Sequence, residues 1–298
     1  MSKELTVING FDEIKGLVLN GIANENTRYA YENGLDIFLN WYQDQGKTAL
    51  NKSVVQEFRS MLDMTGQAPA TINLKLAAVR RLVVEAIDNN ILDPIAGEGI
   101  LRVKGIKARG VRTGNWLTKQ EAQEIINTPD ISTLKGLRDR AILAVALGSG
   151  LRRSEIAALK VDNIKMRDSR WVILDITGKG GRIRTVPIAP WVKKATDQWL
   201  SKANINSGFV FRSTQYKGKL IGEKISDQAI QDVIIKFTGL SAHDMRRSFA
   251  KLAKQGGCPI EQIQFSLGHQ KMATTELYLG STQDLTSAPA DFLGLTIN

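Results

Sequence analysis

The sequence predicts a mainly α-helical protein of two domains, the second of which also contains a small antiparallel sheet. Three observations support this prediction. Apolar residues recur at helical spacing along much of the 298-residue chain, two strand-like runs flank one glycine-rich tip, and a basic stretch without carboxylates divides the chain. A chain of this length suits two domains and can bury its cores without a disulfide or a structural metal.

The N-terminal part contains three segments with the spacing of amphipathic helices. The first is expected over 26–45, ended by Gly46, with apolar positions at Tyr29, Leu35, Phe38 and Leu39. A short second helix is expected over 54–61. A third follows Pro69, with one apolar stripe at alternating spacings of four and three: Ile72, Leu76, Val79, Val83 and Ala86. We therefore expect an all-α first domain.

The opposite side of this third helix carries Asn73, Arg80 and Arg81. Such side chains can form an ordinary solvated face, or they can lie against the phosphates or a groove of a nucleic acid. The sequence leaves both interpretations open.

A basic segment separates the two predicted domains. No acidic residue occurs from Leu101 to Lys119, and the cations alternate with glycine and small residues; they include Lys104, Lys107, Arg109 and Arg112. We place the first domain at 1–103, the linker at 104–116 and the second domain at 117–298. The segment can be a plain linker, or a strap along a phosphate backbone where each neutralised phosphate releases counterions.

The charge of the chain indicates a polyanionic partner. The net charge is +10, yet residues 1–107 carry 12 basic and 13 acidic side chains, while the remaining residues carry 28 and 17. The C-terminal part thus holds the whole surplus, and any contact of the first domain with nucleic acid must use one local face.

The second domain is expected to open on a capping box formed by Thr118 and Glu121, followed by a long helix over 134–147. The runs 171–177 and 182–188 indicate a hairpin around a glycine-rich tip. Helices are expected from Trp191 onward, apart from a short strand over 208–213. This pattern predicts a mixed α+β domain with a small antiparallel sheet.

Scarce residue types narrow the chemistry. With one cysteine, Cys258, and two histidines, neither an intramolecular disulfide nor a Cys/His zinc site is possible by ligand count. No segment has the apolar core of a secretion signal or the length of a membrane span, so we expect a cytoplasmic protein with no membrane partner. The glycine-rich phosphate-binding loop of nucleotide hydrolases is missing too, and we expect neither a metal nor a cofactor.

Four short segments carry the functional information. They are GLRRSE at 150–155, TGKGGR at 177–182, HDMRR at 243–247 and LGHQKMATTELY at 267–278. Each alone would also suit an ordinary helix start, turn or packed terminus. Both histidines of the chain fall within them, however, and together they contain the groups needed to transfer a phosphodiester.

The chemistry explains why these residue types matter. Attack on phosphorus builds negative charge on the non-bridging oxygens, which the planar guanidiniums of Arg152 and Arg246 can match with paired hydrogen bonds. His243 lies three residues before Arg246, on the same helix face, and suits proton handling near neutral pH. Lys179, at the hairpin tip, can protonate a leaving oxygen. Tyr278 can act as a nucleophile once a base or a cationic pocket offsets its usual pKa of about 10.

In order, spacing and residue type, these segments resemble the signature boxes of the tyrosine recombinase, or phage integrase, family, and the resemblance covers the whole chain. It implies an all-α, SAM-like core-binding domain followed by a catalytic domain, in the size class of Xer-type recombinases and simple integrases. The implied enzyme is a site-specific recombinase that cuts and rejoins double-stranded DNA through a 3′-phosphotyrosine, with strand exchange through a Holliday junction. Strand exchange needs four active sites, so the resemblance also implies a tetramer on DNA.

The resemblance assigns catalytic roles to Arg152, Lys179, His243, Arg246, His269 and Tyr278. His269 would join the two arginines in stabilising the transition state, and Glu155 would hold the arginine helix in place.

Arg153 and Arg247 are additional cations next to the two assigned arginines. A shift of either motif by one residue would turn the selected side chain by about a third of a turn around the helix. Arg182 and Arg184 can be phosphate contacts or solvated charges; we count Arg182 among the DNA contacts.

Two rival functions stay open. One is a type IB topoisomerase-like relaxase that acts alone, and the other is a non-catalytic DNA-binding regulator on the same scaffold. The tail after Tyr278 is polar with one apolar knot at Phe292, Leu293 and Leu295, so it can be a frayed terminus, a local cap or a helix donated to a neighbouring copy. The sequence does not indicate the DNA target, the direction of the reaction or any accessory protein.

Overall fold

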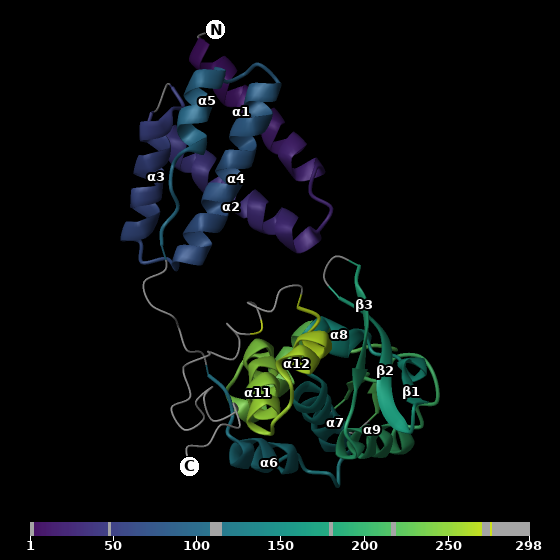
Figure 1. Cartoon of the computed structure of the whole chain (residues 1–298). Coiled ribbons are helices and arrows are strands. Elements are labelled where there is room, and N and C mark those ends of the chain that lie inside the picture. The colour runs from purple at the N-terminus through teal and green to yellow at the C-terminus, as the bar shows by residue number, and fades with distance from the viewer. Residues whose placement is uncertain are drawn as a thin grey trace, which may run out of the picture. The chain divides into compact units, whose positions relative to one another are not determined.

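The computed structural model describes residues 3–46, 49–107, 115–178, 181–215, 219–269 and residue 275 (Figure 1). The chain forms two compact units, unit 1 at Met1–Arg112 and unit 2 at Thr113–Asn298, and their boundary falls within the predicted linker. Unit 1 is helical where it is described, and unit 2 combines helices with two small antiparallel sheets. The predicted fold class is therefore confirmed.

Unit 1 contains five helices in its described part: α1 (Lys3–Asn20), α2 (Glu25–Asp44), α3 (Lys52–Met64), α4 (Pro69–Asp88) and α5 (Pro94–Leu101). Polar side chains start three of them. Asn24, Asn51 and Asp93 each accept a hydrogen bond from a main-chain N–H of the first turn, which satisfies a donor that has no partner within the helix. Pro69 and Pro94 occupy the first helical position of α4 and α5, where a missing N–H costs nothing.

The core of unit 1 forms on the predicted apolar stripe of α4, whose five residues are all buried. On α2, Leu35 and Phe38 are buried, and the Phe38 ring meets Phe58 of α3 edge-on with centroids 5.0 Å apart. The expected apolar role of Tyr29 is wrong, because its side chain is 73% exposed. It lies six residues before Leu35, which turns it about 120° away from the buried face.

Unit 2 begins with α6 (Lys119–Asn127), α7 (Leu134–Ser149) and α8 (Arg153–Ala158), followed by a short 3₁₀ helix (Val161–Asn163). Next come β1 (Ile164–Arg167), β2 (Arg170–Thr177), β3 (Ile183–Pro187), α9 (Pro190–Lys202), β4 (Ser213–Thr214) and β5 (Leu220–Ile221). The described part of the chain closes with α10 (Asp227–Thr238), α11 (Ala242–Gln255) and α12 (Ile260–Leu267). The capping box of Thr118 and Glu121 is confirmed, with both reciprocal hydrogen bonds present.

Helix α7 is the central element of unit 2, because most of its residues are buried and it packs against α6, α9, α10 and α11 (Figure 1). It ends at Gly150, whose φ of +60° is the left-handed conformation that favours glycine. A Cβ at this position would also lie 2.5 Å from the ring of Phe249. Arg152 follows two residues later as the N-cap of α8, so the turn at Gly150 determines where the main chain of Arg152 lies.

The three-stranded sheet has the order β1-β2-β3, and the predicted hairpin forms its β2–β3 part. An irregularity between Ile173 and Ile176 shifts the register, after which Ile176 pairs with Arg184. Strand β1 was not expected. The strand expected over 208–213 is wrong: Phe209 makes only an isolated bridge with Lys160, and Ser213 begins a separate two-stranded sheet.

Candidate active site

The N-terminus of α8 holds the first predicted pair, Arg152 and Glu155. The main-chain N–H of Arg152 donates to Oε2 of Glu155 at 2.8 Å, and Nη1 of Arg152 donates to Oε1 at 2.7 Å. The Glu155 side chain is buried while that of Arg152 is partly exposed. The carboxylate therefore fixes both ends of Arg152 and leaves its guanidinium at the surface of the cluster.

Arg184 on β3 completes the coordination of this carboxylate. Its Nη1 and Nη2 donate to Oε1 and Oε2 of Glu155 at 2.9 and 2.8 Å, which makes a bidentate pair. Burial alone would raise the pKa of Glu155, but the hydrogen bonds and charges of Arg184 and Arg152 outweigh it and hold the pKa below its usual range. The sequence suggested a phosphate contact or a solvated charge for Arg184 and missed this internal role.

Arg246 on α11 is buried at 3% exposure. Its Nη1 donates to the carbonyl of Gly150 at the end of α7, and its Nη2 donates to the carbonyl of Leu267 at the end of α12. Helix C-termini carry partial negative charge and carbonyls without intrahelical partners, so one guanidinium satisfies both ends. Arg246 thereby fixes the segments that lead to Arg152 and to His269.

His269 follows the end of α12, where Gly268 has a φ of +65°. Its Nδ1 lies 3.0 Å from Oγ1 of Thr275, and its main-chain N–H donates to the carbonyl of Gln264. Burial and the nearby guanidiniums of Arg246 and Arg152 lower the pKa of His269 to about 4. The ring is therefore neutral at physiological pH, and the bond at Nδ1 sets which way it faces.

His243 lies near the N-terminus of α11, after Ser241 caps the helix. Burial lowers its pKa, with further lowering by Arg247, Arg246 and Arg152 that Asp244 partly opposes. Arg152 and Arg246 act electrostatically on both histidines of the chain, so the structure brings these four predicted residues together. The cluster combines fixed positive charge with two imidazoles that are neutral at physiological pH.

The two additional arginines pair with carboxylates other than Glu155, although Arg247 also lowers the pKa of His243. Nε of Arg153 pairs with the carboxylate of Asp227 on α10 at 3.2 Å. Arg247 pairs with Asp244 on its own helix at 3.2 Å. Of the first pair, Arg152 is the one that binds the Glu155 carboxylate. Of the second pair, Arg246 is the one that binds the carbonyls at the ends of α7 and α12. These are the two arginines that the motifs selected.

Lys179 and Tyr278 lie outside the described residues. The residue before Lys179 is described: a Cβ built on Gly178 would lie 3.3 Å from Nη1 of Arg184 and 3.5 Å from Nη1 of Arg152. The start of the hairpin tip therefore rests against the two guanidiniums. Arg182 is exposed on the other side of the tip, and its carbonyl accepts a hydrogen bond from Gly178 N–H.

The predicted DNA contacts of unit 1 have intramolecular bonds. Asn73 exchanges two hydrogen bonds with the main chain of Ile106, at 2.9 and 2.8 Å, and Arg80 donates to the carbonyl of Val103. Both side chains therefore hold the extended segment 103–106. Arg81 pairs with Glu85 at 2.8 Å. The DNA contacts expected of these residues stay a prediction.

The predicted DNA contacts also include four cations of the basic segment. Lys104 and Lys107 are exposed, while Arg109 and Arg112 lie outside the described residues. An unexpected contact fixes the start of the segment, because Nη1 of Arg59 donates to the carbonyl of Lys104 at 3.1 Å. Only the spatial arrangement reveals this contact, since Arg59 belongs to no motif.

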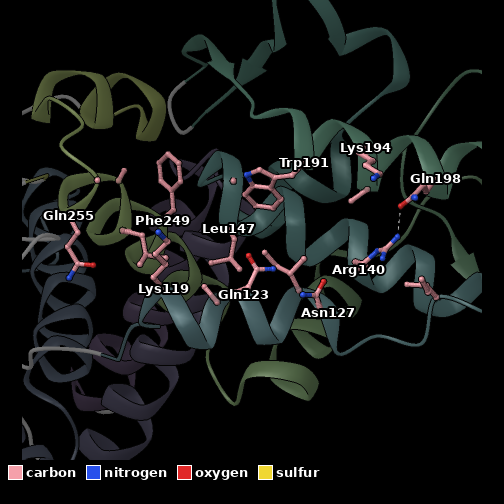
Figure 2. A pocket seen from close by; sticks show the side chains of 18 residues that line it. Lys119, Gln123, Asn127, Arg140, Leu147, Trp191, Lys194, Gln198, Phe249 and Gln255 are labelled. Atoms are coloured by element: carbon pink, nitrogen blue, oxygen red, sulfur yellow. Dashed lines mark hydrogen bonds between the residues drawn. The ribbon is translucent and has the colours of Figure 1, made fainter.

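A groove of about 880 Å³ lies elsewhere on unit 2, among α6, α7, α9 and α11 (Figure 2). Apolar side chains such as Leu147, Trp191 and Phe249 form part of its wall. Lys119, Arg140 and Lys194 bring positive charge, and no carboxylate occurs among the described residues that line it. It contains none of the predicted catalytic residues.

Within the described ranges, no group of His, Cys, Asp or Glu side chains is arranged to hold a metal ion. None of the helices that the structure describes combines the length and apolarity needed to cross a membrane.

The fold and the arginine–histidine cluster match one known family. Residues 115–284 match the model of the phage integrase family, and residues 15–90 match the phage integrase N-terminal SAM-like domain. The chain therefore belongs to the phage integrase family, and as a tyrosine recombinase it is a site-specific recombinase.

Curated relatives agree with this assignment. Tyrosine recombinase XerC of Pseudomonas fluorescens (strain Pf0-1) is 28% identical over 269 residues, which cover 86% of this chain and 85% of the relative. Tyrosine recombinase XerC of Pelotomaculum thermopropionicum is 26% identical over 240 residues, covering 77% and 76%. Tyrosine recombinase XerA of Pyrococcus horikoshii is 26% identical over 259 residues, covering 77% and 89%.

Solved structures share the fold. XerH site-specific recombinase bound to palindromic difH substrate, in a post-cleavage complex, aligns with a TM-score of 0.68 at 22% identity, covering 85% of this chain and 76% of that one. A lambda integrase dimer bound to a COC′ core site aligns with a TM-score of 0.68 at 14% identity, covering 92% and 96%.

Proposed function

We propose that this recombinase cuts and rejoins double-stranded DNA through a covalent phosphotyrosine at Tyr278, without a metal ion or a cofactor. The observation that carries the proposal is the convergence of Arg152 and Arg246 on His243 and His269. Guanidiniums supply fixed positive charge for the non-bridging oxygens of a reacting phosphate, and neutral imidazoles can accept or donate a proton.

Chain length supports the placement of the two remaining residues. Thr275, which lies 3.0 Å from the His269 ring, precedes Tyr278 by three residues, and three residues span at most about 11 Å. Lys179 directly follows Gly178, which rests against Arg152. The proposal therefore needs only a short length of chain between the cluster and each of the two residues.

In the proposed reaction, the phenolic oxygen of Tyr278 attacks the scissile phosphorus and the bond to the 5′ oxygen breaks. Lys179 donates a proton to the leaving 5′ oxygen, and His243 assists removal of the proton from Tyr278. The products are a 3′-phosphotyrosine and a free 5′-hydroxyl. The 5′-hydroxyl of a partner strand reverses these steps, which forms a Holliday junction without nucleotide hydrolysis.

The neutral state of His269 defines its proposed role. With a pKa of about 4, its ring carries no charge at pH 7, so it would donate a hydrogen bond to a phosphate oxygen rather than form an ion pair. The full positive charges on the phosphate would come from Arg152 and Arg246. A bound phosphate would raise the pKa of both histidines, since negative charge favours the imidazolium.

The DNA-binding surface is part of the same proposal. We assign residues 1–103 to a core-binding domain, 104–116 to a linker and 117–298 to the catalytic domain. Phosphate contacts would come from Lys104, Lys107, Arg109, Arg112 and Arg182, with Asn73, Arg80 and Arg81 on the core-binding domain.

DNA affinity should then fall steeply with salt, because each contact releases counterions. A flat salt titration would contradict this surface. The enzyme would act in the cytoplasm.

Self-association into a tetramer on DNA completes the proposed reaction, since two duplexes present four scissile phosphates. The tail carries Asp284, Asp291 and the apolar knot at 292–295, whose charge and apolarity complement the three cations and the apolar side chains that line the groove in unit 2. Deleting residues 288–298 should weaken cooperative binding to a two-site DNA and leave single-site binding unchanged, as measured by gel shift. Unchanged cooperativity would contradict a donated tail.

The decisive experiment uses a nicked suicide substrate, from which the freed end diffuses away and traps the covalent complex. The wild-type chain should form an adduct that survives denaturing electrophoresis, and Tyr278→Phe should bind the DNA equally well without forming one. Adduct formation by Tyr278→Phe would refute the nucleophile. Binding without any adduct by the wild type would instead favour the non-catalytic regulator, and relaxation of arbitrary supercoiled DNA by a monomer would favour the topoisomerase-like enzyme.

A further inference from the structure

We infer that Arg184 is a positioning residue for the proposed reaction, which fixes the Arg152, His269 and Lys179 segments relative to one another. The inference rests on the proposed function and adds a residue that no signature segment predicted for this role. Arg184 comes from β3, whereas the groups that it holds come from α8, the end of α12 and the hairpin tip. Its side chain is 10% exposed, so it is enclosed by these segments.

The first link runs through Glu155 to Arg152. Each oxygen of the carboxylate accepts one hydrogen bond from Arg184 and one from Arg152, so all four bonds have a defined direction. Two guanidiniums share one negative charge, and the trio keeps a net positive charge beside the site. Without Arg184, the carboxylate would be balanced by Arg152 alone, and that stronger pairing would compete with a phosphate for the Arg152 guanidinium.

The second link runs to His269. Nε of Arg184 donates to the carbonyl of Ser266 at 2.9 Å, and Arg246 donates to the next carbonyl, that of Leu267. Two cations therefore satisfy the last two carbonyls of α12, where the helix leaves partial negative charge. His269 follows two residues later, so this cap sets the position from which the ring extends.

The third link is the close packing of two glycines on the Arg184 side chain. A Cβ at Gly268 would lie 3.0 Å from its Cδ, and a Cβ at Gly178 would lie 3.3 Å from its Nη1. Gly268 precedes His269 and Gly178 precedes Lys179. The Arg184 side chain thus fills the space between the two segments that carry these predicted catalytic groups, and glycine is what allows the approach at both.

The test compares Arg184→Gln and Arg184→Lys with the wild-type full-length chain. Single-turnover cleavage of the suicide substrate should fall about 10- to 100-fold in both variants, because a displacement of the reacting groups by about 1 Å is enough for such a loss. DNA affinity should stay within about threefold, because the guanidinium is directed to protein atoms rather than to phosphates. Lysine keeps the charge but cannot bind two carboxylate oxygens and a carbonyl at once, so it should not restore cleavage.

A spectroscopic readout separates positioning from a general effect on folding. The chain has two histidines, so NMR titration follows each of them directly. Arg184 lowers the pKa of His269 and is not among the groups that shift His243. Arg184→Gln should therefore raise the pKa of His269 and leave that of His243 unchanged, while Arg184→Lys should leave both near their wild-type values.

A matched control uses another buried arginine of unit 2. Arg138 forms an ion pair with Asp139 and donates to Thr214, and its side chain is 7% exposed. Arg138→Gln should lower thermal stability without slowing cleavage per folded molecule or shifting either histidine. If it slowed cleavage as much as Arg184→Gln, the loss would come from folding and the inference would be wrong.

The outcomes distinguish this inference from the proposed function. If the wild type forms the adduct and both Arg184 variants cleave at its rate, positioning by Arg184 is wrong and the proposed function stands. If the wild type forms no adduct, the proposed function fails, whatever the histidine titrations report. If Arg184→Gln does not fold, Arg184→Lys decides: slow cleavage with an unshifted His269 supports the inference, and wild-type cleavage overturns it.

Discussion

The two units of this recombinase use similar polar side chains in opposite ways. In unit 2, Arg152 and Arg246 act electrostatically on the same two histidines. In unit 1, Asn73 and Arg80 bind the main chain of their own unit and hold the segment 103–106. A cation or an amide on a helix face therefore does not by itself indicate a ligand. In unit 2 the order and spacing of several segments singled out the residues that cluster, and unit 1 offered no comparable pattern.

The largest expected effect tests the convergence in unit 2. Arg246→Lys should reduce single-turnover cleavage on the order of 10²–10³-fold, because a lysine cannot donate to two helix ends and also to a phosphate. The neighbouring Arg247→Lys is the matched control and should change the rate by less than about threefold, since lysine keeps the positive charge beside His243 and can still pair with Asp244. If both variants lost activity equally, the assignment of the catalytic role to Arg246 rather than to Arg247 would be wrong.

The next effect tests the internal role of Asn73 in unit 1. Asn73→Ala removes both hydrogen bonds to Ile106 and should weaken the attachment of the segment 103–106 by about 1–3 kcal/mol. Hydrogen exchange of the Ile106 amide measures this directly. Gly105→Ala should have a similar effect without removing a polar group, because its Cβ would lie 2.3 Å from Oδ1 of Asn73. If the hydrogen exchange of the Ile106 amide were unchanged in both variants, the internal role that distinguishes Asn73 from the arginines of unit 2 would be wrong.

Acid should act on the two units differently, since both histidines belong to unit 2. The pKa of His269 is about 4 in the folded chain, below its ordinary value of 6.5, so the unfolded state binds the proton first as the pH falls. The stability that the neutral ring provides is complete above pH 6.5 and is lost between about pH 6.5 and 4. Hydrogen exchange at pH 7 and pH 5 should show loosening confined to unit 2; equal loosening of unit 1 would contradict the assignment to the histidines.

The smallest effect concerns Arg81. It forms an exposed ion pair with Glu85 one turn along α4, a contact that contributes about 0.3–0.5 kcal/mol. Arg81→Ala should therefore leave stability almost unchanged and lower DNA affinity only if the guanidinium contacts a phosphate. A salt titration separates these roles, because losing one phosphate contact reduces the slope by about 1.

The sequence predicted those parts of the fold that local patterns determine. The apolar stripe of α4, the capping box at Thr118 and the long helix α7 depend on residues close together in the chain, and all three are confirmed. Strand β1 was missed and the strand over 208–213 was wrong, because four paired residues and a single bridge are too short to leave a periodic signal. Tyr29 failed for a related reason: an aromatic residue was assigned to the buried face by type rather than by its angle around the helix.

The candidate site divides in the same way. Arg152, His243, Arg246 and His269 could be selected because each lies in a short segment of recognisable composition. Arg184 could not, since its importance comes from a carboxylate on α8 and a carbonyl on α12 that only the folded chain brings together. The sequence contained one signal that Arg184 points inward. Residues two apart on a strand share a face, and Arg184 lies two residues before the buried Val186.

The two carbonyls that Arg246 binds also determine when an active enzyme can exist during synthesis and folding. A guanidinium that entered the core before α7 and α12 were both docked would be a buried charge with too few acceptors, which is strongly unfavourable. Arg246 can therefore take its final position only after α11 and α12 have assembled with α7, which lies about 100 residues earlier in the chain. A nascent or partly unfolded chain then lacks one of the groups that we propose act on phosphate, so incomplete copies of the enzyme should not cleave DNA.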